Sequence, residues 1–212
     1  MKKIILALVL GMVAMPGISK DLMYLINLYS VECRDEKGTI RMDTVDSSIS
    51  IDSLISTSWT VSNKVFHFTL KNRTTETIYI DWDEILFINN IGRSERMSFG
   101  GTTYADRLKT HPLSKVIKGT FISETLIPMS NVEHLSGYNF KGYIYPDPIL
   151  DARKFASKQI KDVVYKQSKM MIGTKVKVIF PIKVGDKKYE YEYTFILDEI
   201  RWGKLSSKDA KD

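Results

Sequence analysis

Three carboxylates lie close together in the sequence, at Asp81, Asp83 and Glu84, on either side of Trp82. Carboxylate oxygens are ligands that Ca²⁺ accepts in proteins. In a strand, Asp81 and Asp83 share one face, and Glu84 lies on the opposite face unless the strand bulges. No aspartate-rich loop with a glycine, of the EF-hand kind, accompanies them. A metal site is therefore the alternative hypothesis. A solvated strand end or a salt bridge to lysine or arginine is the favoured one, and we expect no cofactor.

The chain contains three histidines, His67, His111 and His134, and none of their spacings matches His-x-x-x-His. The sequence also lacks the Gly-x-Ser-x-Gly elbow that positions a nucleophilic serine. We therefore predict a non-enzymatic protein. A metal-dependent hydrolase that uses Asp81, Asp83 and a loop histidine is kept as an alternative, together with a protease-inhibitor-like sandwich that rests on analogy of fold alone.

The candidate binding residues lie in two irregular stretches, residues 100–112 and 128–148, where long loops are expected. They are Tyr104, Arg107, Tyr138, Tyr143 and Tyr145. Tyrosines in loops offer a large contact area with a polar tip, which suits a binding surface. In the competing interpretation, the same side chains pack the loops onto the body of the domain.

The first 19 residues have the pattern of a secretory signal peptide. Lys2 and Lys3 precede an apolar run over residues 4–13, and Pro16, Gly17 and Ser19 follow it. The run is shorter than the roughly 20 residues that span a bilayer, and no later segment is apolar enough to do so. The sequence therefore predicts a periplasmic or secreted protein without a transmembrane span.

Charge and cysteine content narrow the function further. Removal of the signal, with Lys2 and Lys3, lowers the net charge from +6 to +4. The remaining basic residues are interspersed with acidic ones and form no stripe, so we do not expect nucleic-acid binding. Cys33 is the only cysteine, which excludes an internal disulfide and favours a buried thiol.

Alternating apolar residues predict strands along most of the mature chain. Residues 65–84, VFHFTLKNRTTETIYIDWDE, are predicted to form a central hairpin with its turn at residues 72–76. Asn72-Arg73-Thr74 matches a glycosylation acceptor but is interpreted as part of this turn. Residues 48–59 are predicted to be one strand, bent near Asp52.

The pairing register of the C-terminal hairpin can be predicted from the sequence. A two-residue turn at Gly185-Asp186 pairs Ile182 with Tyr189, and it places the apolar residues of both strands on one face. Over residues 151–171 the apolar residues no longer alternate but recur at helical spacing. This spacing predicts one amphipathic helix.

These elements define the predicted domain organisation. Residues 1–19 are the signal peptide, and residues 20–45 form a segment that could be a helix or a strand. Residues 46–203 form the main domain, and residues 204–212 a disordered charged tail. The predicted fold class is mainly β, an antiparallel β-sandwich with one late helix.

Several motifs resemble a family of exported bacterial envelope proteins, many of which are lipoproteins. They are Trp59 with residues 65–84, GRSERMSFGGTTYADR, the Val116-Ile117-Lys118-Gly119 turn, Ile127-Pro128 and GTKVKVIFPIKVGDKKYEYEYTF. The resemblance covers roughly residues 48–197 and implies an immunoglobulin-like sandwich that binds a protein or envelope component. The chain lacks a lipid-attachment motif, and Ser98 stands where the family would have a histidine.

Overall fold

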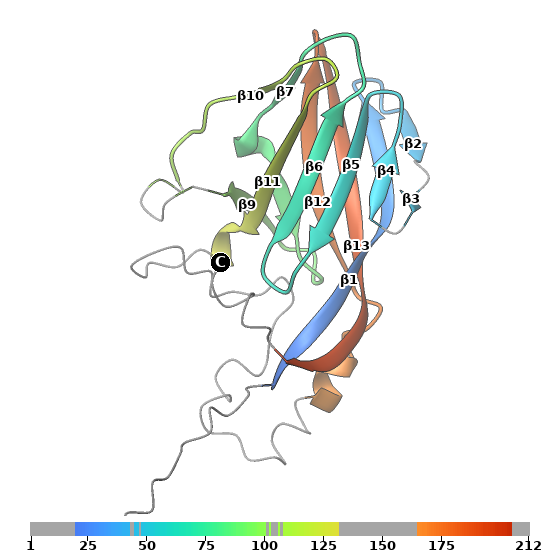
Figure 1. Ribbon diagram of the computed structural model, residues 1–212, viewed down its shortest axis with the longest axis vertical. Helices are drawn as coiled ribbons and strands as arrows, with labels where there is room; N and C mark the ends of the chain where they lie inside the picture. Colours follow the sequence, from blue (N-terminus) through green and yellow to red (C-terminus); the bar gives the residue numbers. More distant parts are fainter. Residues whose placement is uncertain are drawn as a thin grey trace, which may run out of the picture.

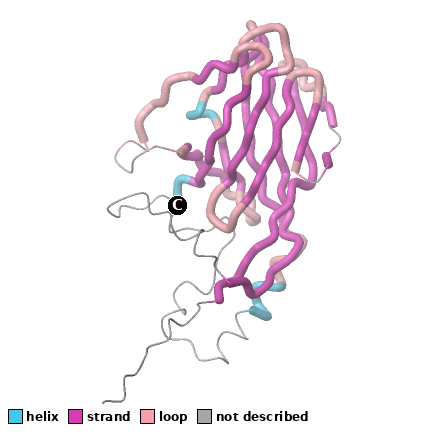
Figure 2. Tube along the Cα trace, in the orientation of Figure 1, coloured by secondary structure: helices cyan, strands magenta, loops and turns pink. Residues whose placement is uncertain are grey.

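The computed structural model describes residues 20–42, 45–46, 48–100, 102, 106, 108–131 and 165–204. Strands make up most of this part of the chain, and helical turns are few and short (Figure 2). The fold is therefore mainly β, as the sequence predicts. The strands are β1 (Lys20–Asp35), β2 (Ile40–Met42), β3 (Val45–Asp46), β4 (Ile49–Ile51), β5 (Ile55–Val61), β6 (Phe66–Asn72), β7 (Ile78–Ile80), β8 (Leu86–Ile88), β9 (Ser94–Phe99), β10 (Ser114–Val116), β11 (Phe121–Pro128), β12 (Lys175–Val184) and β13 (Lys187–Lys204).

These strands form one antiparallel sheet that is nearly closed as a barrel (Figure 1). The order of neighbouring strands is β2-β1-β13-β12-β8-β9-β11-β6-β5-β4-β3, and β7 lies between β10 and β12 beside this path. The two edge strands β2 and β3 are almost consecutive in the chain, from Met42 to Val45, so the two ends of the sheet are held near each other. The expected division into a two-sheet sandwich is not confirmed.

Residues 20–35, which the sequence left open, form the long strand β1. It pairs with β13 from Lys20 opposite Lys204 to Asp35 opposite Tyr189, with irregularities after Leu25 and after Leu28. The two strands continue beyond the barrel as a ribbon (Figure 1). The N-terminal segment therefore belongs to the sheet.

The C-terminal hairpin has the predicted register. Ile182 pairs with Tyr189, and Phe180, Val178 and Val176 pair with Tyr191, Tyr193 and Phe195 in turn. Gly185 has a φ of +59°, a left-handed conformation that glycine adopts without strain, and it begins the turn between β12 and β13. On the outer face, Lys177 forms an ion pair with Glu192, its diagonal neighbour on β13.

Residues 48–59 are not a single bent strand. They form β4 and β5, which pair antiparallel through a turn at Asp52. Asp52 Oδ1 accepts hydrogen bonds from the backbone N–H groups of Leu54 and Ile55, each at 2.7 Å. This local bonding stabilises a reversal of the chain where alternation alone suggested a bend.

Residues 65–84 do not form a hairpin either. β6 pairs with β5 and β11, whereas β7 pairs with β10 and β12. The polar segment between them carries the chain from one region of the sheet to another. Asn72 is fully buried and stabilises this crossing, because its Nδ2 donates to the carbonyls of Glu76 and Val116, at 2.7 and 2.8 Å. The asparagine of the glycosylation motif is therefore structural.

An aromatic cluster fills the barrel. Trp59 on β5 is 3% exposed, and its ring centroid lies 4.7 Å from that of Tyr193 and 5.3 Å from those of Phe68 and Phe195. These side chains come from the neighbouring strands β5 and β6 and from β13, which is far from both in sequence. Their packing, together with the aliphatic residues around them, joins the front and back of the barrel.

Only the C-terminal end of the predicted helix lies in the described part of the chain. Residues 165–169 are helical, and a turn follows that ends at Gly173 with a φ of +86°. Residues 151–164, the rest of the predicted helix, lie outside the described residues, as do the signal segment and the tail from residue 205. Cys33 is buried. No helix in the described part of the chain is long and apolar enough to cross a bilayer.

Candidate functional site

The chain between β7 and β8 forms the 3-10 turn η1 (Trp82–Glu84). The sequence predicted that the strand would continue to Asp83, and this prediction is wrong. Asp81 ends the strand, because its Oδ1 accepts a hydrogen bond from the backbone N–H of Asp83 at 3.0 Å. The turn interrupts the pairing along β12, since β7 reaches only Ile182 and β8 only Ile179. Pro181, which has no backbone N–H to contribute to a ladder, lies at this interruption.

Asp83 points into a cluster of polar partners. It forms an ion pair with Arg96 on β9, and its Oδ2 accepts a hydrogen bond from the backbone N–H of His111 at 3.1 Å. His111 Nδ1 lies 3.0 Å from Asp83 Oδ1. Since an ionised carboxylate only accepts hydrogen bonds, Nδ1 carries the proton in this contact. Burial raises the pKa of Asp83, but the hydrogen bonds from His111 and the charge of Arg96 outweigh it, so the pKa lies below its ordinary value.

Aromatic rings pack against this cluster. The Phe99 ring stacks on that of Trp82 at 4.7 Å and meets the His111 ring edge-on at 4.8 Å. Trp82 is 4% exposed, and its Nε1 donates to Ser114 Oγ at 2.9 Å. The buried tryptophan thus anchors the η1 turn to β10, while Asp83 anchors it to β9 and to the segment before β10.

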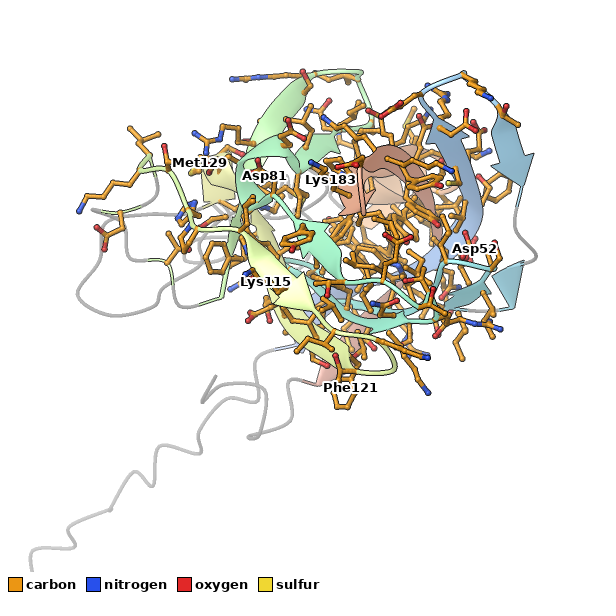
Figure 3. All side chains as sticks on the ribbon, turned by 90° about the horizontal axis from the view of Figure 1, so that it is seen from above. Asp52, Asp81, Lys115, Phe121, Met129 and Lys183 are labelled. Atoms are coloured by element: carbon orange, nitrogen blue, oxygen red, sulfur yellow. The ribbon has the colours of Figure 1, made fainter. Side chains whose placement is uncertain are left out.

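On the other side of η1, a cleft of about 470 Å³ opens on the outer surface. Its volume lies in the range of ligand sites, roughly 300–1,000 Å³. The cleft is lined by Tyr79, Asp81, Glu84, Leu113, Pro181, Ile182, Lys183, Gly185, Asp186 and Lys188. Figure 3 labels Asp81 and Lys183, which lie close to each other when the molecule is seen from above. The 3-10 turn therefore separates two sites, with Asp83 on one side and Asp81 and Glu84 on the other.

The cleft has an apolar floor and a charged rim. Leu113, which is 54% exposed, and the half-buried Tyr79 supply the apolar surface, whereas Pro181 and Ile182 border the cleft with buried side chains. At the rim, Glu84 forms an ion pair with Lys188 at 2.7 Å. Lys183, Asp81 and Asp186 form no ion pair with any described residue, so charges of both signs are left for a ligand.

The geometry does not support the metal hypothesis for Asp81, Asp83 and Glu84. Asp83 bonds to Arg96 and His111, and Glu84 to Lys188, so basic groups occupy two of the three carboxylates. In the described part of the chain, no group of three or more histidine, cysteine, aspartate or glutamate side chains could hold an ion. The salt-bridge interpretation therefore describes Asp83 and Glu84 correctly.

His111 and Asp83 have the arrangement of a base and the carboxylate that orients it. A catalytic pair also requires a reacting group at the other ring nitrogen. His111 Nε2 is buried and has no hydrogen-bond partner among the described residues. The contact with Asp83 therefore orients the ring and joins two segments, without a described nucleophile.

The five predicted binding residues, Tyr104, Arg107, Tyr138, Tyr143 and Tyr145, all lie outside the described residues. In the first predicted loop, residues 100–112, the described positions include residues 108–112, and His111 of this segment contacts Asp83. Sequence reasoning found the three carboxylates and combined a loop histidine with them only in the hydrolase alternative; it missed the partners Arg96 and Lys188 and did not single out His111. Their distance along the chain from residues 81–84 left no spacing that could have revealed them.

No protein-family model, no curated protein and no solved structure matches the chain.

Proposed function

We propose that the chain is an exported, non-enzymatic protein of the bacterial cell envelope, periplasmic or secreted, that binds a protein or another envelope component. The cleft beside η1 carries this proposal. It combines a ligand-sized volume with an apolar floor and rim charges of both signs. The N-terminal signal pattern supports export, and the family resemblance supports the envelope as the place of action.

The lining of the cleft favours a peptide segment of a partner protein as the ligand. An apolar side chain of such a segment would cover Leu113 and the exposed part of Tyr79. Charged groups on either side of it would find Lys183 and Asp186. A small anion would be repelled by the carboxylates of Asp81, Glu84 and Asp186, and a small cation by the two lysines, so a ligand that carries both charges fits best.

Two further parts of the proposal rest on the sequence. On the sequence alone, Tyr104, Arg107, Tyr138, Tyr143 and Tyr145 are proposed as further contact residues, which would suit partners larger than one segment. We also propose that the fold is related to the immunoglobulin-like sandwich. The family resemblance supports this assignment, and the antiparallel pairing of the strands is compatible with it.

Crosslinking and recovery of the protein from intact cells tests the function. Four forms are compared: wild type, a cleft variant (Leu113→Ala with Lys183→Glu), a loop variant (Tyr104→Ala with Tyr143→Ala) and a matched control. The control is Ile117→Ala with Lys118→Glu, since Ile117 is 62% exposed and neither residue lines the cleft. We expect a discrete partner with wild type and control, and at least fivefold less partner with the cleft variant.

The outcomes separate the parts of the proposal. Loss with the loop variant alone would place binding in the loops and remove the cleft from it. Equal recovery in all four forms would contradict binding through either region. An intact Met1 on the cellular protein, measured by mapping its N-terminus, would contradict export.

A further inference from the structure

The outward-facing side of β5, β6 and β11 carries hydroxyl groups in two rows across the strands. Thr60, His67 and Thr125 face one another in one row, and Ser58, Thr69 and Ser123 in the next. We call these six residues the hydroxyl face. Neighbouring side chains bond to each other, with 2.7 Å between Thr69 Oγ1 and Ser123 Oγ, and 2.7 Å between His67 Nδ1 and Thr125 Oγ1. The face is therefore a polar surface in which each row holds one bonded pair, between β6 and β11.

None of these six residues is an acid, a lysine or an arginine, although such residues make up 26% of the chain. The outer face of β12 and β13 differs sharply, because it carries Lys177, Lys183, Lys188 and Glu192, with ion pairs at Lys177 and Lys188. Solvated sheet faces ordinarily carry charged residues. Lys71, which pairs with Phe121 in the next row, and Glu124 at the groove are the charged neighbours of this face. The lack of charge within the two hydroxyl rows thus points to a neutral, hydrogen-bonding ligand.

A shallow groove of about 280 Å³ runs over this face. Its lining consists of the six residues with Phe68 and Glu124. Phe121 lies on the same side of β11, two residues before Ser123, and is 68% exposed. In Figure 3 its ring projects away from the body of the protein. On the opposite flank, Ile49 and Ile51 of β4 are 46% and 54% exposed. Apolar surface therefore borders the hydroxyl face on both sides.

We propose that the hydroxyl face binds a neutral oligosaccharide. Serine and threonine hydroxyls both donate and accept hydrogen bonds, as the hydroxyls of a sugar do, so the two surfaces are complementary without any charge. Glu124 adds an acceptor at the groove. The exposed Phe121 ring offers a flat surface for the apolar face of a sugar ring. The site shares no lining residue with the cleft at η1, so it is independent of the function proposed above.

Affinity electrophoresis of the mature protein tests this proposal. Native gels contain soluble glucans, mannan, galactan or a chitin derivative as neutral probes, and alginate as the anionic probe. We expect at least one neutral polysaccharide to retard the wild-type protein. Phe121→Ala should weaken that retardation at least tenfold, and Ser123→Lys, which places a charge in the centre of the face, should abolish it.

The control variant Ile117→Ala removes an equally exposed apolar side chain elsewhere and should be retarded like wild type. Thermal unfolding of each variant shows that it is folded, which the exposure of Phe121 and Ser123 leads us to expect. The proposal is wrong if no neutral polysaccharide retards the protein, if only alginate does, or if Phe121→Ala and Ser123→Lys bind as well as wild type.

Discussion

The hydroxyl of Tyr191 donates a hydrogen bond to Asp52 Oδ2 at 2.5 Å, and this bond joins β13 to the turn between β4 and β5. Tyr191 is fully buried, and the other oxygen of Asp52 holds the turn itself. One carboxylate therefore fixes both the shape of the turn and its position on the barrel.

Tyr191→Phe should destabilise the protein by about 1–3 kcal/mol, because Asp52 loses a partner in a partly buried site. The free energy of unfolding in urea measures the effect. Tyr189→Phe is the matched control, since Tyr189 lies on the same strand and its hydroxyl has no partner among the described residues. Equal losses in the two variants would contradict the role assigned to the bond.

The same tyrosine predicts a loss of stability in alkali. Burial raises the pKa of Tyr191 far above its ordinary value, and the neighbouring Asp52 carboxylate raises it further. The folded state therefore keeps a proton that the unfolded chain releases above about pH 10. The contribution of Tyr191 to stability is complete below that pH and falls as the pH rises, by up to about 1.4 kcal/mol per pH unit.

Urea unfolding of wild type and Tyr191→Phe from pH 8 to 11 measures this dependence. Above about pH 10 the free energy of unfolding should decline less steeply in the variant, because phenylalanine has no hydroxyl to ionise. Parallel curves would show that Tyr191 does not carry the dependence.

Asp83→Asn should destabilise the protein by about 1–3 kcal/mol at neutral pH, because Arg96 and His111 lose a charged acceptor. The lowered pKa of Asp83 means that its contribution is present above the unfolded value of about 3.9 and disappears as the pH falls through the folded value. The difference between wild type and variant should therefore shrink below about pH 4.

Glu199→Gln is the control for this change. Glu199 is exposed and pairs with no described charge, so its replacement should alter stability by less than about 0.5 kcal/mol. A difference between wild type and Asp83→Asn that stays constant from pH 7 to pH 3 would contradict the electrostatic account of the η1 turn.

Asn72→Ala should cost about 2–4 kcal/mol, because the carbonyls of Glu76 and Val116 and the N–H of Thr74 would lose their partner. Thr75→Ala changes an exposed residue of the same turn and should be nearly neutral. Chemical unfolding distinguishes the two. A nearly neutral Asn72→Ala would show that the crossing from β6 to β7 does not depend on this side chain.

Much of the fold was predictable because short-range patterns determine it. The alternation in residues 175–197 predicts the β12–β13 hairpin and its register, since a shift of one residue would expose the apolar face. Alternation does not say which strands pair. Residues 65–84 contain two clear strands and a turn-like segment, yet Asn72 bonds to Val116, far along the chain, and the two strands join different neighbours.

The candidate site shows the same limit. The sequence identified Asp81, Asp83 and Glu84, but the strand pattern placed Asp81 and Asp83 on one face. The cap at Asp81 instead creates a 3-10 turn, and this turn directs Asp83 toward Arg96 while Asp81 and Glu84 line the cleft. Lys183 reaches the cleft because β12 pairs with β7, a pairing that no local pattern reports, and Lys188 follows as part of the β12–β13 hairpin.

The most direct test of the account is site-specific photocrosslinking in living cells. A photoreactive residue replaces Leu113 in the cleft or, as control, the equally exposed Ile117 outside it. If the cleft beside η1 binds a partner segment, illumination should give a discrete crosslinked product from position 113 and not from position 117, and Lys183→Glu should reduce it severalfold. Products of equal yield from both positions, or none from position 113, would contradict the central claim.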